Sequence, residues 1–189
     1  AMYLYNIQSA KLGAGYNFPD VVTERRVRIK IFNEKGFGEA EIKIPWYKRR
    51  RRTKVTDVEA WIYNLDANGK PTATQVSKEN IFSQKAKAEY GEAAISFTFP
   101  GLKAGSVIEY RYKKAQNYYS NIASWRFQLS IPCAYSLCKV IVPNIVELSY
   151  RPVVTRAISI DSVADNKKIK KDNSQTNFLM TDVPSFISE

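Results

Sequence analysis

The stretch RRVRIKIFNEKGFGEAEIKI (residues 25–44) decides the fold. Apolar residues stand at positions 27, 29 and 31 between basic ones, and at positions 40, 42 and 44 between acidic and basic ones. A period of two is typical of β-strands with one buried face. Asn33-Glu34-Lys35-Gly36 lies between the two runs and has the composition of a turn. The stretch therefore predicts a β-hairpin.

The charges of this predicted hairpin complement each other. With Phe32 facing Phe37, antiparallel pairing places basic residues of the first strand opposite acidic residues of the second: Lys30 opposite Glu39, and Arg28 opposite Glu41. Each such pair contributes about 0.2–1 kcal/mol. We expect the basic strand to be neutralised by its neighbour, which makes it a poor site for polyanions.

The same period recurs along the chain. Alternation predicts further strands at 54–65, 71–76, 95–99, 108–113, 125–131, 137–142, 146–150, 154–160 and 177–181. Asp66-Ala67-Asn68-Gly69 is a hairpin signal, and the only helix that we expect is one turn between residues 77 and 84. The sequence thus predicts an all-β fold: an antiparallel β-sandwich of roughly ten short strands in two sheets, with little or no helix, as a single domain over residues 1–189.

Composition excludes several kinds of chemistry. The chain has 189 residues with 29 Lys and Arg, 18 Asp and Glu and no His, which gives a formal charge of +11. Without His there is no Ser-His-Asp or Cys-His machinery and no His-ligated metal. No window approaches the roughly 18 apolar residues of a membrane-spanning helix. We expect neither a cofactor nor a metal site.

The two cysteines, Cys133 and Cys138, are five residues apart. An odd separation points them to opposite faces if one strand carries both, and a disulfide would need a turn around residues 134–135. Free cysteine is often buried, so we expect two small buried side chains. The sequence leaves open whether they are bridged.

A basic stretch is the sharpest local feature. Residues 48–54 carry six of the positive charges, so the rest of the chain has a formal charge of 11 − 6 = +5. This stretch is a candidate site for a polyanion such as an anionic glycan, with two aromatic anchors before it. The alternative is a solvated hairpin tip that begins where Pro45 ends its strand. The candidate residues are Trp46, Tyr47, Lys48, Arg49, Arg50, Arg51, Arg52 and Lys54.

Other groups are weaker candidates. Asp57 and Glu59 share one face of a strand, as a pair of hydrolytic carboxylates would, but alternation explains them as a solvent row. Tyr110, Tyr112, Tyr118, Tyr119 and Trp125 are the aromatic residues that a sugar platform would need, although we expect Tyr110 and Tyr112 in the core. A second basic cluster at 167–171 reads as a surface hairpin. No recognised nucleic-acid module surrounds the basic residues, so we expect no specific nucleic-acid partner.

Several strings resemble a known bacterial family. They are RRVRIKIFNEKG (25–36), VTDVEAWIYNLDANGK (55–70), FPGLKAGSVIEYRY (99–112), WRFQLSIPCAYS (125–136) and TDVPSF (181–186). The chain resembles the domain of unknown function that precedes a transglutaminase-like domain in secreted or periplasmic proteins, mostly of Bacteroides-type bacteria. The resemblance implies a β-sandwich, a periplasmic or extracellular location and a papain-like catalytic neighbour.

This resemblance transfers no catalytic residue. Without His, neither cysteine is the nucleophile of such an enzyme, and the charged run at 49–52 is unusual for the family. Residues 187–189 read as the start of an interdomain linker, so we expect an excised N-terminal domain.

These observations rank three functions. We expect a non-catalytic accessory module that docks on a downstream transglutaminase-like domain of the same cell-envelope protein. The alternative is a module that binds an anionic polysaccharide or another polyanion through the basic stretch. A stand-alone hydrolase based on carboxylates is the third hypothesis.

Overall fold

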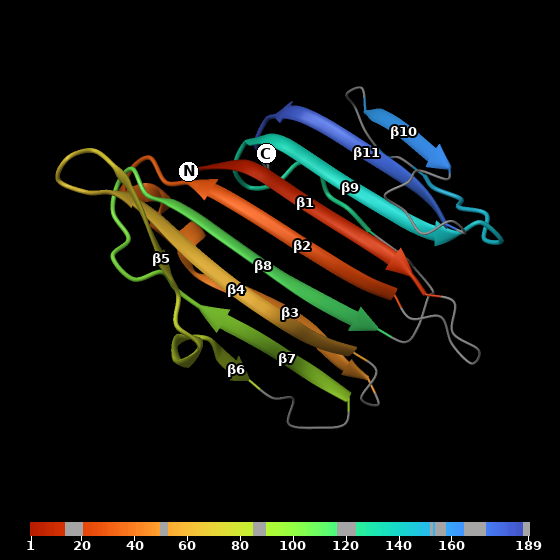
Figure 1. The fold of residues 1–189 in the computed structure, drawn as a ribbon, viewed down its shortest axis with the longest axis horizontal. Helices are drawn as coiled ribbons and strands as arrows, with labels where there is room; N and C mark the ends of the chain where they lie inside the picture. The colour runs from red at the N-terminus through yellow and green to blue at the C-terminus, as the bar shows by residue number, and fades with distance from the viewer. Residues whose placement is uncertain are drawn as a thin grey trace.

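The computed structural model describes residues 1–13, 21–49, 53–84, 90–116, 124–151, 153, 158–164 and 173–186. Within them, eleven strands form a sheet of eight strands and a sheet of three, and both sheets contribute to one core (Figure 1). Two short 3-10 helices are the other regular elements of these ranges. The prediction of an all-β sandwich with little helix is confirmed.

The large sheet has the strand order β10-β11-β9-β1-β2-β8-β4-β5, and the small sheet has the order β3-β7-β6 (Figure 1). The elements are β1 (Met2–Leu12), β2 (Val21–Lys30), η1 (Glu34–Ala40), β3 (Ile42–Arg49), β4 (Thr53–Leu65), β5 (Pro71–Gln75), η2 (Lys78–Asn80), β6 (Phe82–Gln84), β7 (Tyr90–Phe97), β8 (Val107–Gln116), β9 (Cys133–Pro143), β10 (Ser159–Ala164) and β11 (Asn173–Val183).

One pairing departs from the antiparallel pattern. Strands β1 and β9 are parallel, while the other pairings between described strands are antiparallel. A tight turn would have forced an antiparallel arrangement, but these two strands lie far apart in the sequence. Their direction is therefore set by the packing of the sheet.

The stretch 25–44 does not form the predicted hairpin. Strand β2 lies between β1 and β8 in the large sheet, whereas β3 pairs with β7 in the small one. Between them η1 carries the chain from one sheet to the other. Both apolar rows still face the same core, because alternation fixes the buried face of a strand but not its partner. Phe32, without its expected partner, is 54% exposed.

The predicted hairpin of β4 and β5 is confirmed. Asp66 Oδ1 accepts hydrogen bonds from the backbone N–H groups of Asn68 and Lys70, both at 2.9 Å. Gly69 has a φ of 75°, a conformation that glycine adopts without strain. The helical turn expected after it is shorter than predicted: η2 ends at Asn80, and residues 82–84 form β6.

Three other expectations about strands were wrong. Pro45 does not end its strand but lies inside β3, opposite Ala94, where an edge strand tolerates the missing N–H group. Residues 125–131 alternate in burial without joining a sheet, because they lie extended across a sheet face. Residues 146–150 are not a strand either. The predicted strand at 154–160 lies mostly outside the described residues, and β10 begins at Ser159.

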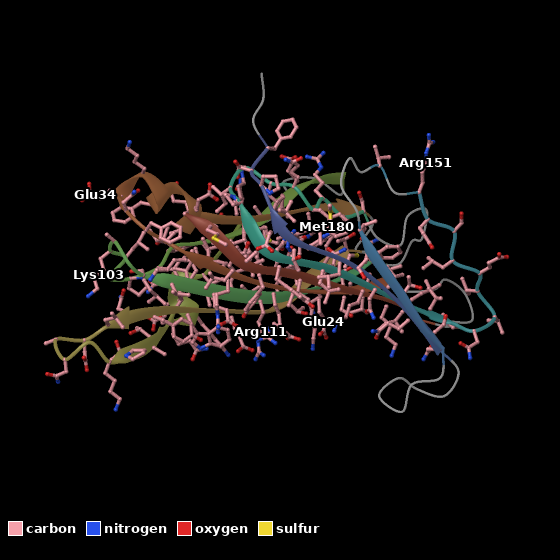
Figure 2. All side chains as sticks on the ribbon, turned by 90° about the horizontal axis from the view of Figure 1, so that it is seen from above. Glu24, Glu34, Lys103, Arg111, Arg151 and Met180 are labelled. Atoms are coloured by element: carbon pink, nitrogen blue, oxygen red, sulfur yellow. The ribbon has the colours of Figure 1, made fainter. Side chains whose placement is uncertain are left out.

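The large sheet has two different sides. Its inner face is the side turned toward the small sheet, and over β2, β8 and β4 it shares a core with that sheet. Over β1 and β9 the segment 124–131 takes the place of the small sheet, with Trp125 and Phe127 packed on the strands. The outer face is the opposite side, and Figure 2 shows Glu24 and Arg111 extending from it, away from the side that carries Met180. Among the residues that the structure describes, no helix has the length and apolarity needed to cross a membrane.

The shared core gives a direct test of the corrected pairing. Replacing Ile29 by Ala should lower the free energy of unfolding by about 3 kcal/mol, because a side chain that is 1% exposed leaves a cavity. Replacing Phe32 by Ala should cost less than about 1 kcal/mol, because the ring is largely in water already. Urea unfolding measures both changes. Equal losses would show that Phe32 has the buried partner that the hairpin gave it.

Candidate functional site

The basic stretch is divided between two strands. Trp46 to Arg49 belong to β3, in register with β7, and Lys54 is exposed near the start of β4. The side chain of Trp46 is half-buried and packs against the shared core. Side chains 47–49 and residues 50–52 lie outside the described part, as do Tyr118, Tyr119 and the basic cluster at 167–171. The structure thus brings Trp46 into the core and leaves Lys54 at the surface.

The outer face of the large sheet carries a network of opposite charges. Arg26 and Arg28 of β2 bind Glu109 of β8, and Arg111 of β8 binds Glu59 of β4. Lys113 lies between two carboxylates, 3.6 Å from Glu24 and 3.1 Å from Asp57. Four cations therefore meet four carboxylates on this face. The expectation that the basic strand is neutralised holds, but its partner is β8 and not the segment 39–44.

Glu109 is the centre of this network. Its side chain is 6% exposed and accepts hydrogen bonds from Arg26 Nη2 at 3.2 Å, from Arg28 Nε at 2.9 Å and from Arg28 Nη2. The hydroxyl of Tyr63 donates to Glu109 Oε2 at 3.3 Å. Arg28 in turn lies over two aromatic rings, with its guanidinium carbon 5.2 Å from the centroid of Tyr5 and 5.4 Å from that of Tyr63. These contacts fix the carboxylate and Arg28 in one arrangement.

The pKa values of this cluster follow from its geometry. Burial alone would raise the pKa of the Glu109 carboxyl, but the hydrogen bonds from Tyr5 and Arg28 outweigh it and hold the pKa below its usual value. Burial, followed by the neighbouring Glu109 carboxylate, raises the pKa of Tyr5 to about 12. At neutral pH Glu109 is therefore ionised and Tyr5 is protonated. Both groups are in their usual protonation states, as in an ion-pair network that stabilises the fold.

The two candidate hydrolytic carboxylates are both in ion pairs. Glu59 accepts two hydrogen bonds from Arg111 Nη2, at 2.9 and 3.0 Å, and Asp57 Oδ2 lies near Lys113 Nζ. They share the outer face as predicted, although a register irregularity interrupts β4 between Thr56 and Glu59. Both line a solvent-open hollow of about 550 Å³ beside Gln75 and Lys78.

The cysteines are buried, as predicted, and both are free thiols. Burial raises the pKa of the Cys133 thiol, and it raises the pKa of Cys138 to about 11. Both lie on the inner face, which differs from the expected opposite faces. The reason is a β-bulge, because β1 has an extra residue between Tyr3 and Tyr5. The pairing of β9 with β1 is interrupted over the same stretch, between Cys133 and Ser136, so the alternation of β9 shifts by one residue there. Neither thiol has the environment of a nucleophile.

Sequence reasoning missed Glu109 and Arg111 as the partners on this face. The signal was present, because Glu109, Arg111 and Lys113 alternate with Ile108, Tyr110 and Tyr112. Tyr110 and Tyr112 pack against the core, as predicted. Within the described residues, no group of His, Cys, Asp and Glu has the arrangement of a metal site.

The Glu109 network predicts a pH-dependent stability. Glu109→Gln should lower the free energy of unfolding at pH 7 by about 2 kcal/mol, because it weakens several charge-assisted hydrogen bonds. A carboxyl with a pKa lowered by folding stabilises the protein above its unfolded pKa, and this stability is lost as the pH falls through the folded value. The difference between the two proteins should therefore shrink below about pH 4.5.

Chemical denaturation between pH 3 and 8 measures this difference. Glu34→Gln is the matched control, because Glu34 is exposed on η1 and takes part in none of the ion pairs between described residues. A loss in Glu109→Gln that stays constant across this pH range would contradict the assignment of Glu109 as an ionised centre.

Comparison with known proteins finds a solved structure with a similar fold and a family model that matches the sequence. The solved structure of a putative protease from Parabacteroides distasonis ATCC 8503 matches it with a TM-score of 0.72 and 11% sequence identity. The match covers 100% of this chain but 36% of that one, so the chain spans about a third of the matched protein's length. None of the curated proteins matches the chain. The family model of the domain of unknown function DUF3857, one with a solved structure, matches residues 20–186, and the chain therefore belongs to the DUF3857 family.

Proposed function

We propose that this DUF3857 domain is a non-catalytic accessory module, which docks on a transglutaminase-like catalytic domain of the same polypeptide. Support comes from the chemistry of its side chains. Both thiols are buried, and the carboxylates of the outer face are engaged by cations. The matched structure, described as that of a putative protease, is nearly three times as long as the region it shares with this chain. This accords with a module that accompanies a larger catalytic part.

One observation carries the docking proposal: the segment after β11 is anchored and presents an aromatic ring. The backbone N–H of Phe186 donates to the carbonyl oxygen of Leu129 at 2.7 Å, and Gln128 Nε2 donates to the carbonyl oxygen of Ser185 at 3.2 Å. The side chain of Phe186 is nevertheless 63% exposed. A domain that follows this segment would start from a fixed direction and meet an apolar contact at once.

Two further parts of the proposal rest on the same family context. We place the module in the periplasm or outside the cell, where the proteins that it resembles are found. Docking should bury roughly 600–1,500 Å², the range typical of contacts between domains of one chain.

The basic stretch supports a second function, the binding of a polyanion such as an anionic glycan. Strand β3 ends at Arg49 and β4 begins at Thr53, and residues 48–54 of the sequence carry six positive charges. Lys54 is exposed and forms none of the ion pairs between described residues. Such a concentration of charge attracts polyanions in a manner that salt screens.

The docking proposal predicts that substitution of Phe186 separates the two domains in a longer polypeptide that contains the next domain. Phe186→Ser should release the two domains, so that NMR relaxation gives two separate rotational correlation times where the unchanged protein gives one. Phe82→Ser is the control, because Phe82 is 65% exposed but lies in β6 of the small sheet. Independent tumbling of the unchanged protein would overturn the docking proposal, as would equal effects of the two variants.

Polyanion binding predicts retention on heparin at physiological salt. Changing residues 49–52 to Ser removes four of the six charges and should move elution to a clearly lower salt concentration. Changing Lys35, Lys43, Lys70 and Lys103 to Ser removes the same charge elsewhere and should shift elution less. Elution of the unchanged protein below physiological salt would end this second proposal.

A further inference from the structure

A row of four polar residues crosses the inner face of the large sheet near the ends of its central strands. Arg25 of β2 lies opposite Gln8 and beside Asn6 of β1. Lys114 of β8 lies opposite Thr23 of β2 and opposite Val55 of β4, which is 8% exposed. Thr53 is two residues before Val55 and therefore points to the same side. We call Asn6, Arg25, Lys114 and Thr53 the inner polar row.

The two cations at the centre of this row are neighbours. Because Lys114 is opposite Thr23, it is the diagonal neighbour of Arg25, at a separation of roughly 7–8 Å between diagonal positions. Both side chains are half-buried, and none of the ion pairs between described residues includes either of them. Burial lowers the pKa of Lys114, as expected for an amine that leaves water without gaining a carboxylate.

The three guanidinium groups on β2 show the contrast between the faces. Arg26 and Arg28 on the outer face bind Glu109, whereas Arg25 donates from Nε and Nη2 to the amide oxygen of Asn6, at 3.2 and 3.1 Å. Its guanidinium carbon lies 5.2 Å from the centroid of the Trp125 ring. Arg25 is thus held in place by a neutral acceptor and an aromatic ring, and not by a carboxylate.

The ends of the row carry buried polar atoms without partners. Asn6 is fully buried and Thr53 is 7% exposed, yet Asn6 Nδ2 and Thr53 Oγ1 have no hydrogen-bond partner among the described residues. Buried polar groups are nearly always paired, and leaving one unpaired costs roughly 1–3 kcal/mol. The row therefore offers two cations in its middle and a neutral hydrogen-bonding group at each end.

Other titratable groups of this region do not complete the row. Glu39 of η1 influences Tyr3 and Tyr110, and both tyrosines are protonated at neutral pH because burial raises their pKa values. Glu39 forms no ion pair with Arg25 or Lys114. On the described part of the chain, positive charge therefore dominates the row.

We propose that the inner polar row binds an acidic oligosaccharide, with a sugar carboxylate held by Arg25 and Lys114 and with hydroxyl groups paired to Asn6 and Thr53. Four adjacent strands span about 14 Å, which is longer than a phosphate or a single carboxylate group. Charge in the middle and neutral donors at the ends match a ligand that carries carboxylates among hydroxyls. A peptide would instead pair its backbone with an open strand edge, and this row lies on a sheet face.

Arg25 and Lys114, the two cations of this site, belong to neither of the other two proposals, although Thr53 lies within the basic stretch. Docking through Phe186 involves the end of β11, and the basic stretch lies at residues 48–54. A polyanion attracted by charge alone would depend on the basic stretch and not on two side chains of the inner face. The tests below change only Arg25, Lys114 and Lys113, so they leave Phe186 and the basic residues of the stretch 48–54 unchanged.

The experiment uses isothermal titration calorimetry with trigalacturonate at physiological salt. Lys114→Gln and Arg25→Gln should each weaken binding at least tenfold. Lys113→Gln is the matched control: it removes the same charge from the adjacent residue, but Lys113 lies on the outer face between Glu24 and Asp57 and should change affinity less than twofold. Absence of binding by the unchanged protein would overturn the proposal, and so would equal losses in the Lys113 and Lys114 variants.

Two further measurements distinguish the ligand classes and exclude unfolding. The methyl ester of trigalacturonate should not bind, whereas an acidic peptide of equal charge that bound as tightly would overturn the assignment to a sugar. Lys114→Gln should keep a melting temperature at or above that of the unchanged protein, because it removes a half-buried charge beside Arg25. A lower melting temperature would show that Lys114 stabilises the fold, which contradicts its assignment as an unpaired ligand-binding charge.

Discussion

The register between β2 and β8 is the constraint on which the rest of the molecule depends. It sets Val27 opposite Tyr110 and Ile29 opposite Ile108 on the inner face, while Arg28 faces Glu109 on the outer one. Because side chains alternate along a strand, a slip by one residue would move Glu109 into the core and the isoleucines into water. The core shared with the small sheet and the ion pairs of the outer face are thus two consequences of one pairing.

This register also separates satisfied charge from unsatisfied charge. The ion-pair network of the outer face joins four cations to four carboxylates, which neutralises the basic residues Arg26 and Arg28 of β2. Along the same two strands, the inner face holds Arg25 and Lys114 without a carboxylate partner in the described ranges. A charge that stabilises the fold is matched, and one that is left unmatched at partial burial has a cost that a ligand would offset. We therefore expect a ligand to bind at the inner polar row and not at the ion pairs of the outer face.

The sequence allowed the faces to be predicted but not the partners. Alternation correctly identified the buried row of β2, yet the partner of Arg28 is Glu109, 81 residues away, and not Glu41. Strand β1 escaped prediction because an extra residue breaks its period between Tyr3 and Tyr5, and because its buried row includes Asn6. Residues 125–131 show the reverse case, since burial against one sheet face produces alternation without strand pairing. Arg25 and Lys114 were detectable, because each occupies a position in the apolar register of its strand.

The segment 124–131 contacts both the end of the chain at Phe186 and the inner polar row at Arg25. Trp125 donates from Nε1 to Ser136 Oγ at 3.1 Å and lies against Arg25, while Leu129 accepts the hydrogen bond of Phe186. This segment is not held by strand pairing, so its position depends on these side-chain and backbone contacts. A domain docked at Phe186 and a ligand bound beside Arg25 would both act on it. Any coupling between the two places through this segment would be reciprocal, so that each would change affinity at the other by the same factor.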